Sequence, residues 1–311
     1  IFVSENWIGK NNSTGTITLE NKEAVGIFSK NNGNGYTAEN GGSIVLGKVD
    51  KSTNYQSLIG MFGQAESGKT ASVKNTGTIN INTKKSVGMY AKNDPVIFPI
   101  LVPANTVTAV NLHNTGTINI NNAESAGIYA PNATISKVGK INLEDSTASN
   151  GSSAVYISKG GKVSDTTTGE ISLGTKNQNR VAYYVNGANS VLAGTNIGKI
   201  TGYGVGVYLQ GNSKTDVAKI NASTPKLDYT AATGANGNGI IGLFLNGDTN
   251  IQMYNKGIVV GDTVVKDKNI PGDKPKYAIG IYAKGQGIPG TGGTTYNIVT
   301  PIKASGRWRG W

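Results

Sequence analysis

Two short phrases recur along this chain, always in the same order. The first, Asn-Thr-Gly-Thr-Ile-Asn-Ile-Asn, occupies residues 75–82 and returns at residues 114–121. The second follows each copy, as Ser-Val-Gly-Met-Tyr-Ala at residues 86–91 and Ser-Ala-Gly-Ile-Tyr-Ala at residues 125–130. Such self-similarity is typical of a repeat architecture, in which each unit contacts its neighbours along one axis. A repeat chain grows by adding units, so 311 residues need not divide into two globular domains.

Looser copies of the second phrase end in an aromatic residue nine times. Neighbouring aromatic residues are 24 to 39 positions apart. The shortest spacing fits one coil of a three-sided solenoid, and the longer spacings require loops inserted at the corners. The nine aromatic residues are Phe28, Phe62, Tyr90, Tyr129, Tyr156, Tyr184, Tyr208, Phe244 and Tyr282.

The first phrase precedes each aromatic copy, and a weaker third apolar stretch fills several of the remaining intervals. β-Branched residues between Gly and Asn turn signals predict short strands, and no stretch shows sustained helical periodicity. We therefore predict an all-β chain that forms a single right-handed parallel β-helix of about nine to ten coils, roughly 40 Å long. Copies of the first phrase lie at residues 15–19, 42–46, 77–81, 116–120, 139–143, 169–173, 198–202, 218–222 and 257–260.

Alternation within the first phrase predicts which side chains face the core. Successive strand residues point to opposite faces. Ile118 and Ile120 then share the inner face, while Thr117, Asn119 and Asn121 share the outer one. Stacked isoleucines should fill the core in every coil.

The same alternation, applied to the second phrase, predicts an outward aromatic file. Val87, Met89 and Ala91 share one face, and Gly88 and Tyr90 share the other. Because the first set is apolar or small in most copies, we expect it inside and the glycine beside the aromatic ring outside. The ring would then cover the bare backbone of the glycine.

Composition narrows the classes of partner and of chemistry. The net charge of +11 favours anionic partners, but the lysines are spread along the chain and are expected in solvated turns, so no nucleic-acid partner is expected. The absence of cysteine excludes a disulfide scaffold and a cysteine-ligated metal site. A single histidine without cysteine does not supply the usual ligands of a zinc site, and we expect no metal and no cofactor.

Parallel β-helices also include polysaccharide lyases and glycoside hydrolases, so an enzyme is the first alternative. Glycoside hydrolysis requires two carboxylates about 5–9.5 Å apart. Most acidic residues here fall in predicted turns, and Glu144 and Asp145 are adjacent, so their side chains should diverge. His113, the single histidine, precedes a repeat turn. We predict no catalytic residue and no enzymatic activity.

Three features are candidates for binding a partner. The outward tyrosines could meet sugar rings or could simply form a structural ladder. The insertion at 94–105 is apolar and rich in proline, and it either folds back on the rod or presents an apolar patch. Two further insertions, 223–239 and 262–276, are long loops of the kind that carry function. The candidate residues are Tyr90, Tyr129, Tyr156, Tyr184, Tyr208, Val96, Ile97, Phe98, Ile100, Leu101, Lys266, Lys268, Lys274 and Lys276.

Both ends of the sequence have the pattern of unfinished coils. Residues 1–3 begin within a strand pattern, and residues 298–302 begin another coil. A solenoid needs caps at its ends, so we expect residues 1–311 to be one β-helix segment of a longer chain. Residues 303–311 are atypical, with two of the three tryptophans in the chain.

The paired phrases resemble the passenger regions of the large fusobacterial type V autotransporter adhesins of the RadD kind. The resemblance covers roughly residues 11–299. It implies a β-helical passenger exported through a C-terminal barrel, and membrane contact only through that barrel, whose alternating strands are not found in this sequence. It also implies a place on the extracellular side of the bacterial outer membrane.

The resemblance further implies adhesion or coaggregation through a host or bacterial cell-surface protein or glycan. The segment would either bind the partner itself or present a distal binding tip. Two alternatives remain open at this point: a polysaccharide-processing lyase or glycoside hydrolase, and a purely structural stalk.

Overall fold

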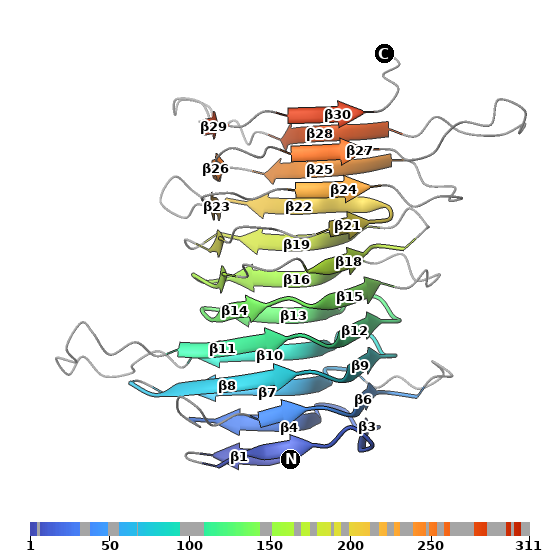
Figure 1. Ribbon diagram of the computed structural model, residues 1–311, viewed down its shortest axis with the longest axis vertical. Coiled ribbons are helices and arrows are strands. Elements are labelled where there is room, and N and C mark those ends of the chain that lie inside the picture. Colours follow the sequence, from blue (N-terminus) through green and yellow to red (C-terminus); the bar gives the residue numbers. More distant parts are fainter. Residues whose placement is uncertain are drawn as a thin grey trace, which may run out of the picture.

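A computed structural model shows three parallel sheets wound into ten coils, as a right-handed parallel β-helix (Figure 1). Each sheet has ten strands, and each coil contributes one strand to every sheet. The predicted fold class is confirmed. The structure describes residues 1–4, 7–31, 38–48, 56–66, 68–93, 109–143, 151–164, 169–174, 179–187, 190–193, 199–211, 218–222, 227–230, 239–246, 249–253, 258–261, 277–284, 297–299 and 302–305.

The three sheets are named A, B and C in the order in which the chain visits them. Sheet A contains β1 (Phe2–Ser4), β4 (Val25–Lys30), β7 (Ile59–Ala65), β10 (Val87–Asn93), β13 (Ala126–Pro131), β16 (Ser152–Ser158), β19 (Arg180–Asn186), β22 (Gly204–Gln210), β25 (Gly239–Asn246) and β28 (Tyr277–Lys284). Sheet B contains β2 (Gly9–Asn11), β5 (Ala38–Asn40), β8 (Thr70–Asn75), β11 (Ala109–Asn114), β14 (Thr134–Lys137), β17 (Lys162–Val163), β20 (Val191–Leu192), β23 (Ala218–Ala222), β26 (Thr249–Met253) and β29 (Asn297–Val299). Sheet C contains β3 (Thr16–Leu19), β6 (Ser43–Leu46), β9 (Thr78–Ile81), β12 (Thr117–Ile120), β15 (Lys140–Leu143), β18 (Glu170–Ser172), β21 (Lys199–Thr201), β24 (Leu227–Thr230), β27 (Ile258–Gly261) and β30 (Ile302–Ser305).

The first phrase forms sheet C and the second forms sheet A, with one exception. Residues 218–222, expected among the copies of the first phrase, form β23 and pair with β20 and β26 of sheet B. The sheet C strand of that coil is β24, which lies inside the range 223–239 expected as an insertion. Residues 219–221, Lys-Ile-Asn, match the first phrase, whereas Leu-Asp-Tyr-Thr of β24 does not. The sequence pattern therefore assigned β23 to sheet C in place of β24, and this assignment was wrong.

Strands continue to both ends of the described chain. β1 and β30 confirm the strand patterns expected at residues 1–3 and 302. The range 303–311, expected as an atypical tail, begins inside β30, because this strand pairs with β27 as far as Ser305. No helix occurs among the described residues, and none of them therefore forms a helix able to cross a membrane.

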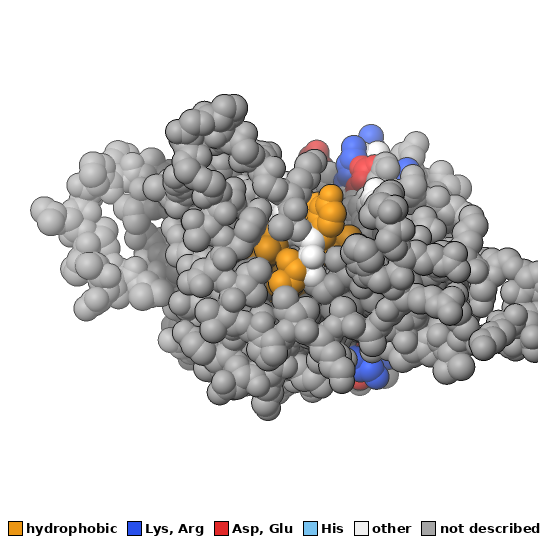
Figure 2. All heavy atoms as spheres, turned by 90° about the horizontal axis from the view of Figure 1, so that it is seen from above, with side chains coloured by type: hydrophobic (Ala, Val, Ile, Leu, Met, Phe, Trp, Pro, Cys, Tyr) orange, Lys and Arg blue, Asp and Glu red, His pale blue; other side chains and the backbone are white. Residues whose placement is uncertain are grey.

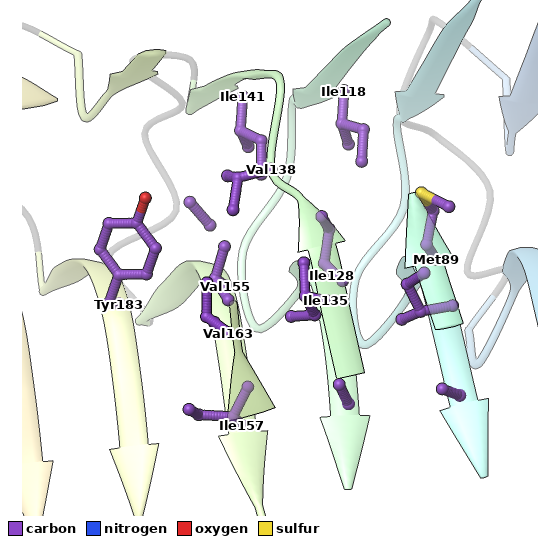
Figure 3. Packing of buried hydrophobic residues seen from close by; sticks show 14 of the residues in the cluster. Met89, Ile118, Ile128, Ile135, Val138, Ile141, Val155, Ile157, Val163 and Tyr183 are labelled. Atoms are coloured by element: carbon purple, nitrogen blue, oxygen red, sulfur yellow. The ribbon is translucent and has the colours of Figure 1, made fainter. Parts of the chain in front are cut away.

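Apolar files fill the interior, as expected from the alternation of the first phrase. Ile118 and Ile120 are buried, and Asn119 is half-buried on the outer side. Side chains from all three sheets meet in the middle, among them Met89 of sheet A and Ile135 of sheet B (Figure 3). Along the axis of the rod, apolar side chains show in the middle and the coloured charged side chains lie towards the margins (Figure 2). The core is therefore one continuous column.

The small residue of the second phrase faces inward, contrary to the expected outward position. A Cβ on Gly88 would lie 2.6 Å from Gly127 O and 3.1 Å from Ile118 Cγ2. Gly88 and Met89 are both buried, so alternation fails at this step, whereas Val87 is half-exposed. At Gly88 the corner between sheets C and A leaves no space for a side chain, whereas alanine fills the equivalent buried position at Ala154 and Ala182. The same arrangement recurs at Gly26, Gly60 and Gly127.

A buried ladder of asparagines joins the first four coils between sheets B and C. Asn11 Nδ2 donates to Asn40 Oδ1, Asn40 Nδ2 to Asn75 Oδ1, and Asn75 Nδ2 to Asn114 Oδ1, each at 2.8 Å. Asn114 Nδ2 donates in turn to Val138 O at 2.6 Å, where an apolar residue ends the ladder. Each interior amide is both donor and acceptor, so buried polar groups are satisfied by their own equivalents.

A second buried ladder lies at the corner that precedes sheet A. Ser86 N donates to Ser125 Oγ and Ser125 N donates to Ser152 Oγ, both at 3.2 Å. Arg180 is the register partner of Ser152 in the next coil and is buried. Its Nη1 donates to Leu173 O at 2.6 Å, so the guanidinium binds a strand-end carbonyl of sheet C.

The inward glycine gives a test of packing. We expect Gly88→Val to destabilise the protein by about 1–3 kcal/mol, because the new side chain must displace Gly127 O and Ile118. The outward Thr117→Val in the same coil should change stability by less than about 0.5 kcal/mol. Urea and thermal unfolding followed by circular dichroism measure both. Equal midpoints for the two variants would contradict the inward position.

The asparagine ladder gives a second test. Asn75→Ala leaves Asn40 Nδ2 and Asn114 Oδ1 without their 2.8 Å partners. Asn40 Nδ2 keeps longer bonds to Gly42 O and Thr78 O, at 3.3 and 3.4 Å, so Asn114 Oδ1 is the group left unsatisfied. The free energy of unfolding should therefore fall by about 1–3 kcal/mol. The matched control is Asn119→Ala, because Asn119 also bonds to asparagines of both neighbouring coils but is half-exposed. Water replaces its bonds, so the control should lose under about 1 kcal/mol in the same unfolding measurements.

Candidate binding face of sheet A

The outer face of sheet A carries an unbroken file of aromatic rings, one in each coil. Neighbouring ring centroids are 4.8 to 5.3 Å apart from the first coil to the last. The file includes the nine predicted aromatic residues and Phe2, which the repeat pattern missed because the phrase is incomplete at the start of the sequence. Stacked pairs of this kind contribute about 0.5–1.5 kcal/mol each.

Most of these rings lie face to face along the rod. From Phe28 to Tyr184 the angle between neighbouring ring planes is 10° to 18°. Tyr184 and Tyr208 break this order with an edge-to-face contact at 82°, and Tyr208 and Phe244 are again parallel. Within the parallel part each ring face contacts another ring, so a partner meets ring edges and hydroxyl groups rather than open faces.

Amide side chains of the following coil hold three of the tyrosine hydroxyls. Asn186 Nδ2 donates to Tyr156 Oη at 3.0 Å, and Asn246 Nδ2 donates to Tyr208 Oη at 2.9 Å. The Tyr184 hydroxyl donates to Gln210 Oε1. Each amide belongs to the residue two positions after the aromatic residue of its own strand. That offset was visible in the sequence, but diagonal contact between coils could be assigned only once the register was known.

The hydroxyl of Tyr184 resists ionisation. Burial, followed by the nearby Tyr156 and Tyr208 hydroxyls, raises the pKa of Tyr184 to about 12 from its ordinary 10.0. The phenol is therefore neutral across the physiological pH range, and the middle of this face carries donors and acceptors without charge.

The structure brings the five predicted tyrosines together and leaves the other candidate residues untested. Tyr90, Tyr129, Tyr156, Tyr184 and Tyr208 are consecutive and half-buried in the file. The other candidates lie outside the described residues: Val96, Ile97, Phe98, Ile100 and Leu101 of the 94–105 insertion, and Lys266, Lys268, Lys274 and Lys276 of the 262–276 insertion.

Acidic side chains on two described strands are flanked by cations in both neighbouring coils. Glu39 carboxylate oxygens lie 3.5 Å from Lys10 Nζ and 3.4 Å from Lys74 Nζ. Glu170 is the register partner of Lys140 and Lys199. A glycosidase pair would need a second carboxylate at such positions, so these files are better suited to cross-strand charge pairing.

The single histidine lies beside a serine on the outer face of sheet B. His113 Nδ1 is 3.2 Å from Ser136 Oγ. The Ser136 hydroxyl also donates to Leu112 O at 3.3 Å, so toward His113 it is placed to accept. A nucleophilic serine would instead donate to the imidazole. Within the described part of the chain, no three His, Cys, Asp or Glu side chains group as metal ligands.

Comparison with known families identifies one similarity. Residues 4–98 match the family model described as the BigA third pectate lyase-like domain. That range covers most of the first three coils and β10 of the fourth. Comparisons with curated proteins and with solved structures gave no match.

The raised pKa of Tyr184 predicts a loss of stability in strong base. Between pH 10 and pH 12 the unfolded chain loses the phenolic proton while the folded chain retains it, so stability present below pH 10 should fall as the pH rises towards 12. Tyr184→Phe keeps the stacked ring and removes the titrating group. Its unfolding midpoint should therefore depend less on pH in this window than that of the parent chain. If the urea midpoints of the two proteins depended equally on pH in this window, the raised pKa of Tyr184 would be contradicted.

Proposed function

We propose that this chain is a β-helical passenger segment of a bacterial surface autotransporter, and that it takes part in adhesion or coaggregation on the extracellular side of the outer membrane. The observation that carries the proposal is the rigid outer face of sheet A, with its continuous aromatic file. Such a surface presents ring edges at a regular spacing along the rod, with hydroxyls from Tyr90 to Tyr208 and amides beside three of them. Partners of this chemistry are a cell-surface protein or a glycan.

The family match supports a bacterial surface protein as the source of this segment. A pectate lyase-like β-helix is repeated in one dimension, and a rod of this kind projects a surface away from its point of attachment. The place within a type V adhesin, and of the RadD kind in particular, is the finer part of the proposal and rests on the repeated phrases alone.

A polysaccharide-processing enzyme is the second candidate, because the matched family model is described as pectate lyase-like. The flanking of Glu39 and Glu170 by lysines argues against a carboxylate pair at those positions. We therefore favour binding without catalysis. Release of reducing or unsaturated sugar ends from a panel of polysaccharides would favour the enzyme instead.

Binding by the segment can be separated from a role as a spacer by removing whole coils. Deletion of residues 152–203 removes the sixth and seventh coils and places β22 beside β13, because Gly204 then takes the register position of Ser152. If the outer face of sheet A binds the partner, binding of the purified segment to a glycan array and to bacterial and host cells should fall at least tenfold. If the segment is only a stalk, the same deletion made in the intact parent protein should leave the binding of that protein unchanged.

Deletion of residues 94–103 and of residues 262–276, each made separately, locates binding that depends on the insertions. We expect both deletions to retain binding if the sheet A face carries it. Loss of binding in either deletion, with an unchanged circular dichroism spectrum, would place the contact on that insertion.

A further inference from the structure

Four consecutive rings of the aromatic file are phenols in parallel contact. The centroids of Tyr90 and Tyr129 are 5.3 Å apart, and those of the next two pairs, ending at Tyr156 and Tyr184, are 4.8 Å apart. The angles between their planes are 12°, 18° and 11°. Phe62 precedes this set, and the edge-to-face contact with Tyr208 ends it.

The backbone register places equivalent ring atoms beside one another. Each tyrosine is the direct register partner of the next. Parallel strands are about 4.8 Å apart, so rings with nearly the same spacing must leave the backbone in nearly the same direction. The hydroxyls then lie on one side, and the ortho carbons (Cε) of neighbouring rings face each other. The rings are half-buried, which leaves their outer edges accessible.

We propose that Tyr90, Tyr129, Tyr156 and Tyr184 form an oxidative cross-linking site at which neighbouring rings couple into dityrosine and tie successive coils together. The oxidant is a peroxide acting through a haem peroxidase. Each of two phenols loses one hydrogen atom, as an electron and a proton, to give a phenoxyl radical. The radicals join through their Cε carbons, and the ring hydrogens on these carbons move to the oxygens as the rings regain aromaticity. One peroxide is reduced to two waters for each carbon–carbon bond formed.

The same geometry sets the limits of the site. Tyr184 and Tyr208 meet edge to face at 82°, so their Cε carbons are not in register. Phe62 and Phe244 carry no hydroxyl from which a phenoxyl radical could form. Coupling is therefore expected at three neighbouring pairs, and the pair of Tyr184 and Tyr208 is an internal control.

A covalent bond across one coil would serve the role that disulfides serve in other exported proteins. This chain has no cysteine and cannot form them. Each dityrosine would close a loop of one whole coil, with partners 39, 27 and 28 residues apart. Cross-links of this length restrict the unfolded chain, so they stabilise the coils that they join. The inference concerns the stability of the rod and does not depend on what the rod binds.

The test is oxidation of the full chain with hydrogen peroxide and a haem peroxidase. Dityrosine fluorescence should develop, and tryptic digestion should release linked peptide pairs. The four tyrosines fall in separate tryptic peptides, 86–92, 93–137, 141–159 and 181–199, so the mass identifies each linked pair of peptides. Fragmentation of 181–199 then separates Tyr184 from Tyr183. Three linked pairs are expected, and a link from 181–199 to the Tyr208 peptide 200–214 should be absent. The oxidised protein should also unfold at a higher temperature.

Tyr129→Phe is the matched variant, because phenylalanine occupies the equivalent position in four other coils of the file. The variant should fold, should lose the two pairs that involve residue 129, and should keep the pair of Tyr156 and Tyr184. Mixing isotope-labelled with unlabelled chains distinguishes links within one molecule from links between molecules. Links found only between molecules, or a full set of links in the variant, or no dityrosine at all, would overturn the proposal.

Discussion

In the described strands, residues lie over their register partners in the next coil, about 4.8 Å away. A side chain must therefore pack against a neighbour of its own kind, over and over along the rod. The ladders are formed by residue types that pack or hydrogen-bond well with copies of themselves. They are isoleucine in the core, asparagine and serine at the corners, and aromatic rings on the outer face of sheet A. The repeated phrases are the sequence consequence of this single constraint.

For charged side chains, stacking a residue on its own kind is unfavourable. Like charges opposite one another on neighbouring strands are destabilising, so a file of lysines alone would be unfavourable. Glu39 separates Lys10 from Lys74, and Glu170 separates Lys140 from Lys199. The carboxylates of these files therefore act as spacers between cations. This arrangement allows charged residues to be stacked in register without an acidic catalytic pair at these positions.

The outer face of sheet A differs from the buried ladders because it is ordered and only half-buried. Its rings are fixed by stacking, and three of its hydroxyls are fixed by amides from the next coil. A surface held in this way loses little conformational freedom when it meets a partner. The same fixed spacing underlies the proposed adhesion, where the partner meets edges and hydroxyls, and the proposed cross-links, where one ring meets the next.

Alternation and spacing are local properties, so the repeat, the fold class, the inward isoleucines such as Ile118 and the file of tyrosines could all be predicted from the sequence. The folded coil, in contrast, decided the direction of Gly88, which faces inward because the corner between sheets C and A breaks the alternation. It also decided that β23 belongs to sheet B, and that Asn75 sits in a buried ladder. In each case the deciding contact joins residues one coil apart, and the corner loops change the sequence distance between coils. A fixed spacing in the sequence therefore could not predict these contacts.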